Sequence, residues 1–331
     1  MPTVLITGAA GFIGMHTTLR FLYNKWDVIG IDDLNDYYSV KLKQDRLRIL
    51  ETSKRYSTFR FFKKSLLDDD LFDLLNDYNF DAVIHLAAQA GVRYSIENPF
   101  TYQKTNIEGF LRIIDYVKER KIGKFIYASS SSVYGKTDEQ PLKESADCSN
   151  PESFYAATKL SNELMASAYF NTHGLSSIGL RFFTVYGPWG RPDMAPMLFL
   201  NATRNKEAIK VFNFGNQSRD FTYIDDIVEA IYRIINKSEN VVNGPLVFNI
   251  GNGKPVNLMD FIRIIEKESG VFLKKELVPA QPGDVEKTYA DVSKLEGYIG
   301  CFSKTSIESG IVSLVRWFNE YYGIERNSPN S

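Results

Sequence analysis

The sequence predicts an α/β fold in which a doubly wound parallel sheet is accompanied by a smaller, mixed carboxy-terminal domain. Three observations predict it. Short apolar strands alternate with helix-length amphipathic segments over the first two-thirds of the chain, a pattern typical of a parallel sheet with helices on both faces. The alternation loosens after Gly187, where prolines stand at 188, 192 and 196. At 331 residues the chain is also long enough for two domains.

The expected elements follow in chain order. The strands are expected at Thr3–Gly8, Asp27–Asp32, Ala82–Ala87, Lys124–Ser130 and Leu175–Phe182, with a helix-like stretch after the first of them running to about Asn24. Toward the carboxyl end, a strand followed by a capped helix is expected twice. We expect residues 1–182 to form the first domain, with about 219–250 returning to it. Residues 183–218 and 251–331 are then expected to form the second.

The stretch Val40–Lys64 is rich in Lys and Arg. Because Leu42, Leu47, Ile49 and Leu50 fit one helical face, a solvated amphipathic helix is favoured over an anion-binding or membrane-binding patch. The acidic run at 68–70 is expected to mark a helix start, where carboxylates favour the helix dipole.

Composition excludes several classes of protein. The net charge of −1 argues against a general nucleic-acid-binding surface. No apolar stretch approaches the roughly 18–20 residues that a membrane span needs, and the amino terminus begins directly with a strand pattern. Cys148 and Cys301 make no disulfide framework, and His16, His85 and His173 are scattered. We therefore expect a cytoplasmic protein without a metal, a nucleic-acid partner or a membrane partner.

A glycine-rich turn follows the first strand and opens a helix. The glycines of "GAAGFIG", at Gly8, Gly11 and Gly14, allow a tight turn, and the helix amino terminus offers N–H groups to a pyrophosphate. Asp32 ends the next strand, where an acid accepts ribose hydroxyls. Because Asp32 and Asp33 would repel a 2′-phosphate, the sequence predicts a Rossmann domain that binds NAD rather than NADP.

A second set of residues carries candidate chemistry. Tyr155 and Lys159, four residues apart, share one face of a helix. A nearby ammonium stabilises a phenolate, so we expect Lys159 to lower the pKa of Tyr155 toward neutrality. The serine-rich segment Ser129–Gly135 stands at the carboxyl end of a strand, where ligands bind in doubly wound folds.

Taken together, these motifs resemble the extended short-chain dehydrogenase/reductase superfamily, from the glycine turn to "PGDV" at Pro282–Val285. The closer resemblance is to its sugar-nucleotide 4-epimerases acting on UDP-glucuronate, through "AAQAGVRYSIENP", "SSSSVYG" and "LRFFTVYGPWGRPDM". It implies tightly bound NAD, a UDP-sugar substrate and a homodimer. The dimer would pair the apolar faces of Asn106–Arg120 and Ala157–Phe170, although these faces could also simply cover the sheet.

The resemblance also implies site residues. The catalytic set is Ser130, Ser131, Ser132, Tyr155 and Lys159. The cofactor set adds Gly8, Gly11, Phe12, Ile13, Gly14, Asp32, Asp33, Asn35, Ser65, Leu66, Leu86, Ala87, Ala88, Gln89 and Asn106 to Tyr155 and Lys159. The substrate set is Val92, Arg93, Ser130, Thr184, Arg191, Phe212, Arg219 and Asp284.

Two positions depart from the relatives. Ser65 stands where many of them have an acid that contacts adenine. Gln281 replaces the Arg that often precedes "PGD", which leaves Arg219 as the main diphosphate candidate, against a structural pair with Asp220 or Asp225. Asp284 is equally a ribose contact or a structural residue.

The expected reaction is 4-epimerisation of UDP-glucuronate through a 4-keto intermediate. Related decarboxylases carry a glutamate at Ser132, and dehydratases an Asp-Glu pair at Ser131 and Ser132; both acids are absent here. Arg191, in a stiff Gly-Pro frame, is expected to hold the sugar carboxylate, against a plain surface turn. The alternatives are a neutral UDP-sugar 4-epimerase, then a decarboxylase or dehydratase, and last a non-catalytic NAD-binding protein.

Overall fold

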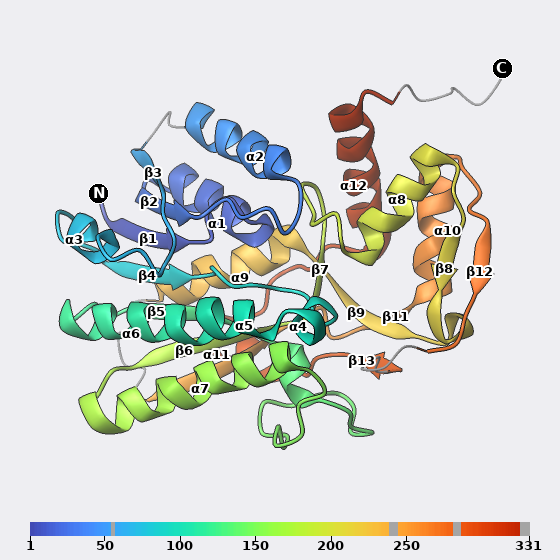
Figure 1. Cartoon of the computed structure of the whole chain (residues 1–331). Coiled ribbons are helices and arrows are strands. Elements are labelled where there is room, and N and C mark those ends of the chain that lie inside the picture. Colours follow the sequence, from blue (N-terminus) through green and yellow to red (C-terminus); the bar gives the residue numbers. More distant parts are fainter. Residues whose placement is uncertain (54–56, 238–243, 281–285, 325–331) are drawn as a thin grey trace.

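A seven-stranded, wholly parallel sheet forms the centre of the molecule (Figure 1). The structure, a computed structural model, describes residues 1–53, 57–237, 244–280 and 286–324. The strand order is β10-β6-β5-β4-β1-β2-β3. The strands are β1 (Thr3–Thr7), β2 (Asp27–Asp32), β3 (Phe59–Lys63), β4 (Ala82–His85), β5 (Phe125–Ser130), β6 (Ser177–Phe182) and β10 (Pro245–Ile250). The order reverses at β1, so the predicted doubly wound sheet is confirmed.

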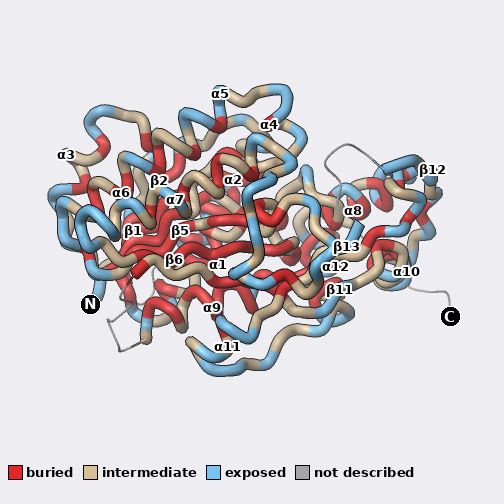
Figure 2. The backbone as a smooth tube through the Cα atoms, turned by 90° about the horizontal axis from the view of Figure 1, so that it is seen from below, coloured by how far each residue is buried: buried red, intermediate tan, exposed pale blue. Residues whose placement is uncertain are grey.

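Helices cover both faces of this sheet. On one face α1 (Phe12–Tyr23) lies against α9 (Ile224–Asn236), and on the other lie α6 (Gly109–Glu119) and α7 (Phe154–His173). Shorter helical segments fill the connections: α3 (Leu71–Leu75), α4 (Tyr94–Glu97), α5 (Pro99–Tyr102), the π-helical turn η1 (Gln103–Glu108) and the 3₁₀ turn η2 (Ser131–Tyr134). Both faces of the sheet are therefore shielded from water, as a parallel sheet requires. Figure 2 shows the central strands coloured as buried.

A second group of elements flanks one end of the sheet. It contains a four-stranded sheet of β7 (Thr184–Tyr186), β9 (Ser218–Tyr223), β11 (Pro255–Asn257) and β13 (Lys287–Thr288), and a pair of β8 (Ile209–Val211) with β12 (Lys275–Leu277). Its helices are α8 (Ala195–Asn205), α10 (Leu258–Ser269) and α12 (Ile307–Tyr322), with the 3₁₀ turn η3 (Phe212–Gly215). Aromatic residues of this group, such as the stacked rings of Phe221 and Phe261, form its own apolar core.

The stretch expected to return to the first domain is divided. Strand β9 belongs to the smaller sheet, whereas α9 and β10 pack with the main sheet, together with α11 (Ser293–Ile299). The domain boundaries themselves stay a prediction. In the part of the chain that the structure describes, no helix is long and apolar enough to cross a membrane.

The basic stretch differs from the expectation. It holds α2 (Val40–Thr52) and the strand β3 rather than one long helix, and the exposed fraction of Ile49 is 37%. The buried face carries Leu42 and Leu50 as expected, but also Lys43 at 4% exposed and Arg46 at 0%. Two cations are buried on this face because they reach polar groups of the loops beside it, which periodicity cannot reveal.

Candidate active site

One cavity of about 860 Å³ lies between the carboxyl ends of the main strands and the smaller group of elements. It is lined by nearly all the residues expected at the site, from the glycine turn to Phe212 and Arg219. Asn106 does not line it, and Asp284 lies outside the described residues. A ligand that filled this cavity would touch both groups of elements at once.

The glycine turn forms one end of the cavity. Gly8 has a φ of +73°, and a Cβ there would lie 2.8 Å from the backbone nitrogen of Ala87. A Cβ on Gly14 would lie 1.9 Å from the carbonyl oxygen of Gly8. Only glycine fits at these positions, so the first turn of α1 presents its N–H groups to the cavity without side chains in the way.

Asp32 ends β2 beside this turn. One carboxylate oxygen accepts from the Ala10 N–H at 3.1 Å and the other from the Leu34 N–H at 2.9 Å. Burial raises the pKa of Asp32, and the charge of Lys43 acts in the opposite direction. Lys43 was missed by the sequence analysis; its ammonium donates to the Asn35 carbonyl at 2.7 Å and also lines the cavity.

Ser65 makes a local contact. Its hydroxyl accepts from the Leu67 N–H at 3.2 Å, and its own N–H donates to Asp68 at 3.0 Å. Ser65 and Leu66 both line the cavity. Asp68 thus closes this turn, and Asp70 pairs with Lys64. Helix α3 begins at Leu71, directly after the acidic run that was expected to start a helix.

Asn106 supports the cavity wall from behind. Its amide oxygen accepts from the Gln89 N–H at 2.8 Å, and its amide nitrogen donates to the Gln89 carbonyl at 3.0 Å and to the Thr158 hydroxyl at 3.0 Å. The exposed fraction of Asn106 is 1%. It therefore links the loop at Gln89 to Thr158 of α7, and its expected role at the cofactor stays a prediction.

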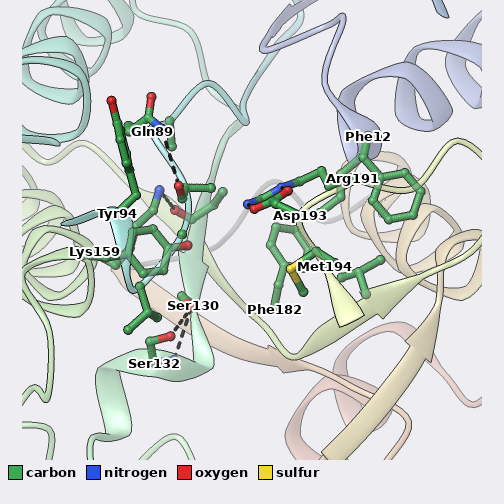
Figure 3. A pocket seen from close by; sticks show the side chains of 18 of the residues that line it. Phe12, Gln89, Tyr94, Ser130, Ser132, Lys159, Phe182, Arg191, Asp193 and Met194 are labelled. Atoms are coloured by element: carbon green, nitrogen blue, oxygen red, sulfur yellow. Dashed lines mark hydrogen bonds and ion pairs between the residues drawn. The ribbon is translucent and has the colours of Figure 1, made fainter. Parts of the chain in front are cut away.

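Tyr155, Lys159 and Ser130 all line the cavity, and Tyr155 is hydrogen-bonded to Ser130. Figure 3 shows Lys159 and Ser130 on the same side of the cavity. Ser153 caps α7 by accepting from the Ala156 N–H at 3.1 Å, which sets the first turn that carries Tyr155. Lys159, one turn later, is 2% exposed and donates to the Ala128 carbonyl at 2.8 Å. At the end of β5, Ser130 donates to the Ser132 hydroxyl at 3.1 Å.

The electrostatics of this trio differ from the expectation. Burial raises the pKa of Tyr155, against a hydrogen bond with Ser130 and the charge of Arg191, which both lower it. Burial also lowers the pKa of Lys159 to about 7. Burial outweighs the effects that lower the pKa of Tyr155, and Lys159, contrary to the expectation, is not among the groups that lower it.

Beneath the serine segment lies a buried ion pair that the sequence did not suggest. Arg181 of β6 donates to both carboxylate oxygens of Glu163, at 2.9 and 2.7 Å, and the Ser129 hydroxyl donates to the same carboxylate at 2.5 Å. The side chains of Arg181 and Glu163 are 6% and 9% exposed. This network joins β6 to β5 and α7, the two elements that carry Ser130, Tyr155 and Lys159.

On the other side of the cavity stand the expected substrate residues. Val92, Arg93, Thr184, Phe212 and Arg219 line it, and the Arg93 guanidinium lies 5.0 Å from the centre of the Phe212 ring. Arg219 donates to the carbonyls of Ser218 and Glu286, each at 3.1 Å.

One of the two alternative partners considered for Arg219, Asp220, accepts hydrogen bonds from other residues. The buried carboxylate of Asp220 accepts from the N–H groups of Asn252, Gly253 and Ala290. It therefore serves to join loops of the smaller group of elements.

Arg191 projects into the cavity beside Asp193 (Figure 3). Its Nε and Nη2 atoms donate to the two oxygens of Asp193, at 3.1 and 2.5 Å. Tyr37 donates to the same carboxylate at 3.2 Å, from the loop after β2. Arg191 is thus already paired, which the plain surface-turn interpretation did not anticipate. The aspartate two residues along in "GRPDM" was the available signal; nothing in the sequence marked Tyr37.

No metal site accompanies these residues: within the described ranges, no three His, Cys, Asp or Glu side chains gather closely enough to hold an ion. The arrangement can hold a dinucleotide at one end, move a proton through a tyrosine in the middle, and present arginines at the other end.

Comparisons with known proteins agree with this arrangement. The model of the NAD dependent epimerase/dehydratase family matches residues 4–251. The Staphylococcus aureus protein CapI is 47% identical, over 96% of this chain and 99% of CapI, and UDP-glucuronate 4-epimerase 4 of Arabidopsis thaliana is 40% identical, over 98% of this chain and 77% of the plant protein. The crystal structure of UDP-glucuronic acid 4-epimerase from Bacillus cereus with UDP-glucuronic acid and NAD is 34% identical. Its TM-score is 0.90, over 97% of this chain and 100% of that one.

Proposed function

This chain belongs to the NAD dependent epimerase/dehydratase family, and from that membership we propose that it interconverts UDP-glucuronate and UDP-galacturonate by 4-epimerisation. One observation carries the proposal. Along nearly its whole length the chain superimposes on a UDP-glucuronic acid 4-epimerase, and its cavity holds a dinucleotide turn, a Tyr-Lys pair and an arginine together.

The residues present fit NAD. Gly8 and Gly14 leave the amino terminus of α1 open to a diphosphate, and the carboxylates of Asp32 and Asp33 suit ribose hydroxyls and disfavour a 2′-phosphate. When bound, NAD supplies the chemistry that the protein lacks, because it accepts a hydride from C4 of the sugar and returns it to the opposite face.

The chain's own residues handle the proton. Tyr155 as phenolate takes the proton from the 4-hydroxyl during oxidation and gives it back during reduction. Ser130 donates a hydrogen bond to the same oxygen. Lys159, whose ammonium donates to the Ala128 carbonyl, would add positive charge beside the phenolate and would hold the nicotinamide ribose when NAD is bound. Hydrogen bonds and charges held in place around the reacting atoms are the main way in which the protein accelerates the reaction.

The substrate carboxylate decides between competing reactions. A 4-keto group β to the C5 carboxylate makes a β-keto acid, which loses CO2 readily, so an epimerase must hold the carboxylate in place. Arg191 is the proposed partner, and the hydroxyls of Thr184, Ser131 and Ser132 line the same cavity. Because these serines replace the acids of decarboxylases and dehydratases, epimerisation is favoured over both alternatives.

Incubation of the purified protein with UDP-glucuronate alone, followed by separation of the nucleotides, tests the proposal. UDP-galacturonate should appear without added NAD, because the bound cofactor ends each turnover unchanged. The Tyr155→Phe variant should lose this activity by roughly 10²-fold or more while retaining its NAD. A pentose nucleotide with CO2 as the main product from the wild type would refute the proposed function.

We also propose that the protein is a cytoplasmic homodimer that pairs α6 and α7. Leu111 on α6 and Leu164 on α7 are 43% and 63% exposed, although they are large and apolar. Light scattering on the purified protein measures the mass, and a double change of Leu111 and Leu164 to Glu should yield monomers. A wild-type protein that is monomeric at micromolar concentration would contradict the pairing.

A further inference from the structure

The contact between Arg191 and Asp193 has a specific geometry. Asp193 occupies only the side edge of the guanidinium, formed by Nε and Nη2. Arginine has five N–H donors in a planar fork, so this leaves the end edge, formed by Nη1 and the second N–H of Nη2, for another acceptor. Nη1 makes no hydrogen bond to Asp193, and the Tyr37 side chain is also hydrogen-bonded to the guanidinium.

Asp193 is itself fixed from outside its own loop. Its Oδ2 atom accepts from Arg191 and from the Tyr37 hydroxyl, and its Oδ1 atom accepts from Arg191. The Tyr37 ring packs against Tyr94 with 4.9 Å between the ring centres, and the Arg191 guanidinium lies 5.9 Å from the centre of the Tyr37 ring. The orientation of Arg191 is thus tied to the NAD side of the cavity, across the boundary between the two groups of elements.

Arg191 and Tyr155 line the same cavity. Its charge lowers the pKa of Tyr155, although Arg191 follows β7 and Tyr155 lies in the first turn of α7. The Arg191 side chain is 20% exposed, so its charge is only partly screened by water. A guanidinium that turned freely would point its donors in changing directions. A bidentate contact to a carboxylate requires the guanidinium to keep one orientation.

We propose that Asp193 is a positioning residue for substrate specificity: it holds the side edge of Arg191 so that the end edge faces the C5 carboxylate of the sugar. The inference rests on the proposed function, since only an acidic sugar uses that edge. Asp193 does not contact the substrate; it acts through Arg191. Tyr37 in turn keeps Asp193 in place.

The grip of Arg191 on the carboxylate affects the fate of the 4-keto intermediate. When CO2 is lost, the C5–C6 bond breaks, its electron pair enters the C4 carbonyl as an enolate, and C5 then takes a proton to give a UDP-4-keto-pentose. This requires the C5–C6 bond to align with the carbonyl π system. A carboxylate gripped by a fixed arginine edge cannot turn into that alignment, so a loosened Arg191 should release more CO2 per turnover.

The test compares Asp193→Ala with the wild type on acidic and neutral substrates. For UDP-glucuronate, kcat/KM should fall about tenfold or more, and the share of pentose nucleotide among the products should rise. The dissociation constant of UDP-glucose, measured by calorimetry in the Tyr155→Phe background, should change less than about twofold, because a neutral sugar does not use the arginine edge. Asp193→Asn keeps one acceptor oxygen, so its kcat/KM for UDP-glucuronate should lie between the values of Asp193→Ala and the wild type.

Two controls separate positioning from general damage. Asp36→Ala removes an exposed acid from the Tyr37 loop with the same change in charge, and should leave both measurements unchanged. The double variant Arg191→Ala, Asp193→Ala should be no worse on UDP-glucuronate than Arg191→Ala alone, because Asp193 acts only through the arginine.

The inference is overturned if the losses of UDP-glucuronate turnover caused by Arg191→Ala and Asp193→Ala add in the double variant. It is also overturned if Asp193→Ala weakens UDP-glucose binding as much as it weakens UDP-glucuronate turnover. Failure of the proposed function gives a different result: the wild type itself then makes no UDP-galacturonate.

Discussion

Arg46 donates from Nη2 to the carbonyl oxygen of Trp189 at 2.7 Å, and from Nη1 to the carbonyl oxygen of Ala10 at 3.0 Å. One fully buried guanidinium therefore joins the glycine turn to the loop that carries Arg191. His16 contacts the same loop, through the Pro188 carbonyl at 3.0 Å. The two ends of the cavity are held at a fixed separation by these contacts.

Loss of Arg46 should loosen both ends of the cavity together. In Arg46→Met the carbonyls of Ala10 and Trp189 lose their donor in a dry environment, so we expect a loss of stability of about 2–4 kcal/mol and a lower NAD content after purification. Chemical denaturation and the absorbance of released nucleotide measure the two effects. Arg48→Met, at an exposed position of the same helix, is the control; equal losses in both variants would contradict the role of Arg46.

The ion pair of Glu163 and Arg181 should matter for stability and for the serine segment. Glu163→Gln leaves the Arg181 charge buried without its counter-charge, which we expect to cost about 3–5 kcal/mol of unfolding free energy. The exposed pair of Asp260 and Arg263, with side chains 57% and 69% exposed, offers a matched comparison. Asp260→Asn should change the unfolding free energy by less than about 1 kcal/mol. A Glu163→Gln protein as stable as Asp260→Asn would show that the buried pair is not needed.

The low pKa of Lys159 predicts a pH dependence of stability in the NAD-free protein. The folded value, about 7, lies below the ordinary value for lysine, so between the two pKa values the unfolded chain binds more protons than the folded one. Stability should therefore rise with pH above about 7, by up to about 1.4 kcal/mol per pH unit from this group. Lys159→Met should show a flatter rise in denaturation experiments between pH 7 and 9. Identical slopes in the two proteins would mean that Lys159 keeps an ordinary pKa.

An acid placed at Ser132 should discriminate against the acidic sugar. In Ser132→Glu a second carboxylate would stand near the substrate carboxylate, so we expect the KM for UDP-glucuronate to rise about tenfold or more by like-charge repulsion. Ser132→Gln has nearly the same shape without the charge and should be affected much less. If both variants bind UDP-glucuronate equally well, the sugar carboxylate does not lie near this serine.

Much of the molecule follows from local sequence patterns. Alternating apolar strands and amphipathic helices predict the doubly wound sheet, because the spacing of apolar residues indicates whether a segment is a strand or a helix and which of its faces is buried. The glycine turn, Asp32 and the spacing of Tyr155 and Lys159 are readable for the same reason. Each depends on a short stretch of backbone and its immediate chemistry.

Other features depend on residues that are far apart in the chain. Periodicity assigned the cations of α2 to solvent, yet Arg46 is buried because the carbonyls that accept from it come from two distant loops. Likewise the pKa of Tyr155 is governed by burial, which only the packed cavity creates. Arg191 was expected to hold the sugar carboxylate from a stiff loop, with no protein partner foreseen for it. The fold pairs it with Asp193 and brings Tyr37 to that carboxylate.

The sequence by itself determined the type of fold, the nucleotide-binding turn and the residue types of the proton-transfer site, since these are properties of contiguous segments. Tertiary structure alone decided which charges are buried, which groups face the cavity and which edge of Arg191 is left open. Those properties arise from hydration and from contacts between distant segments, and they exist only once the chain has closed around its cavity.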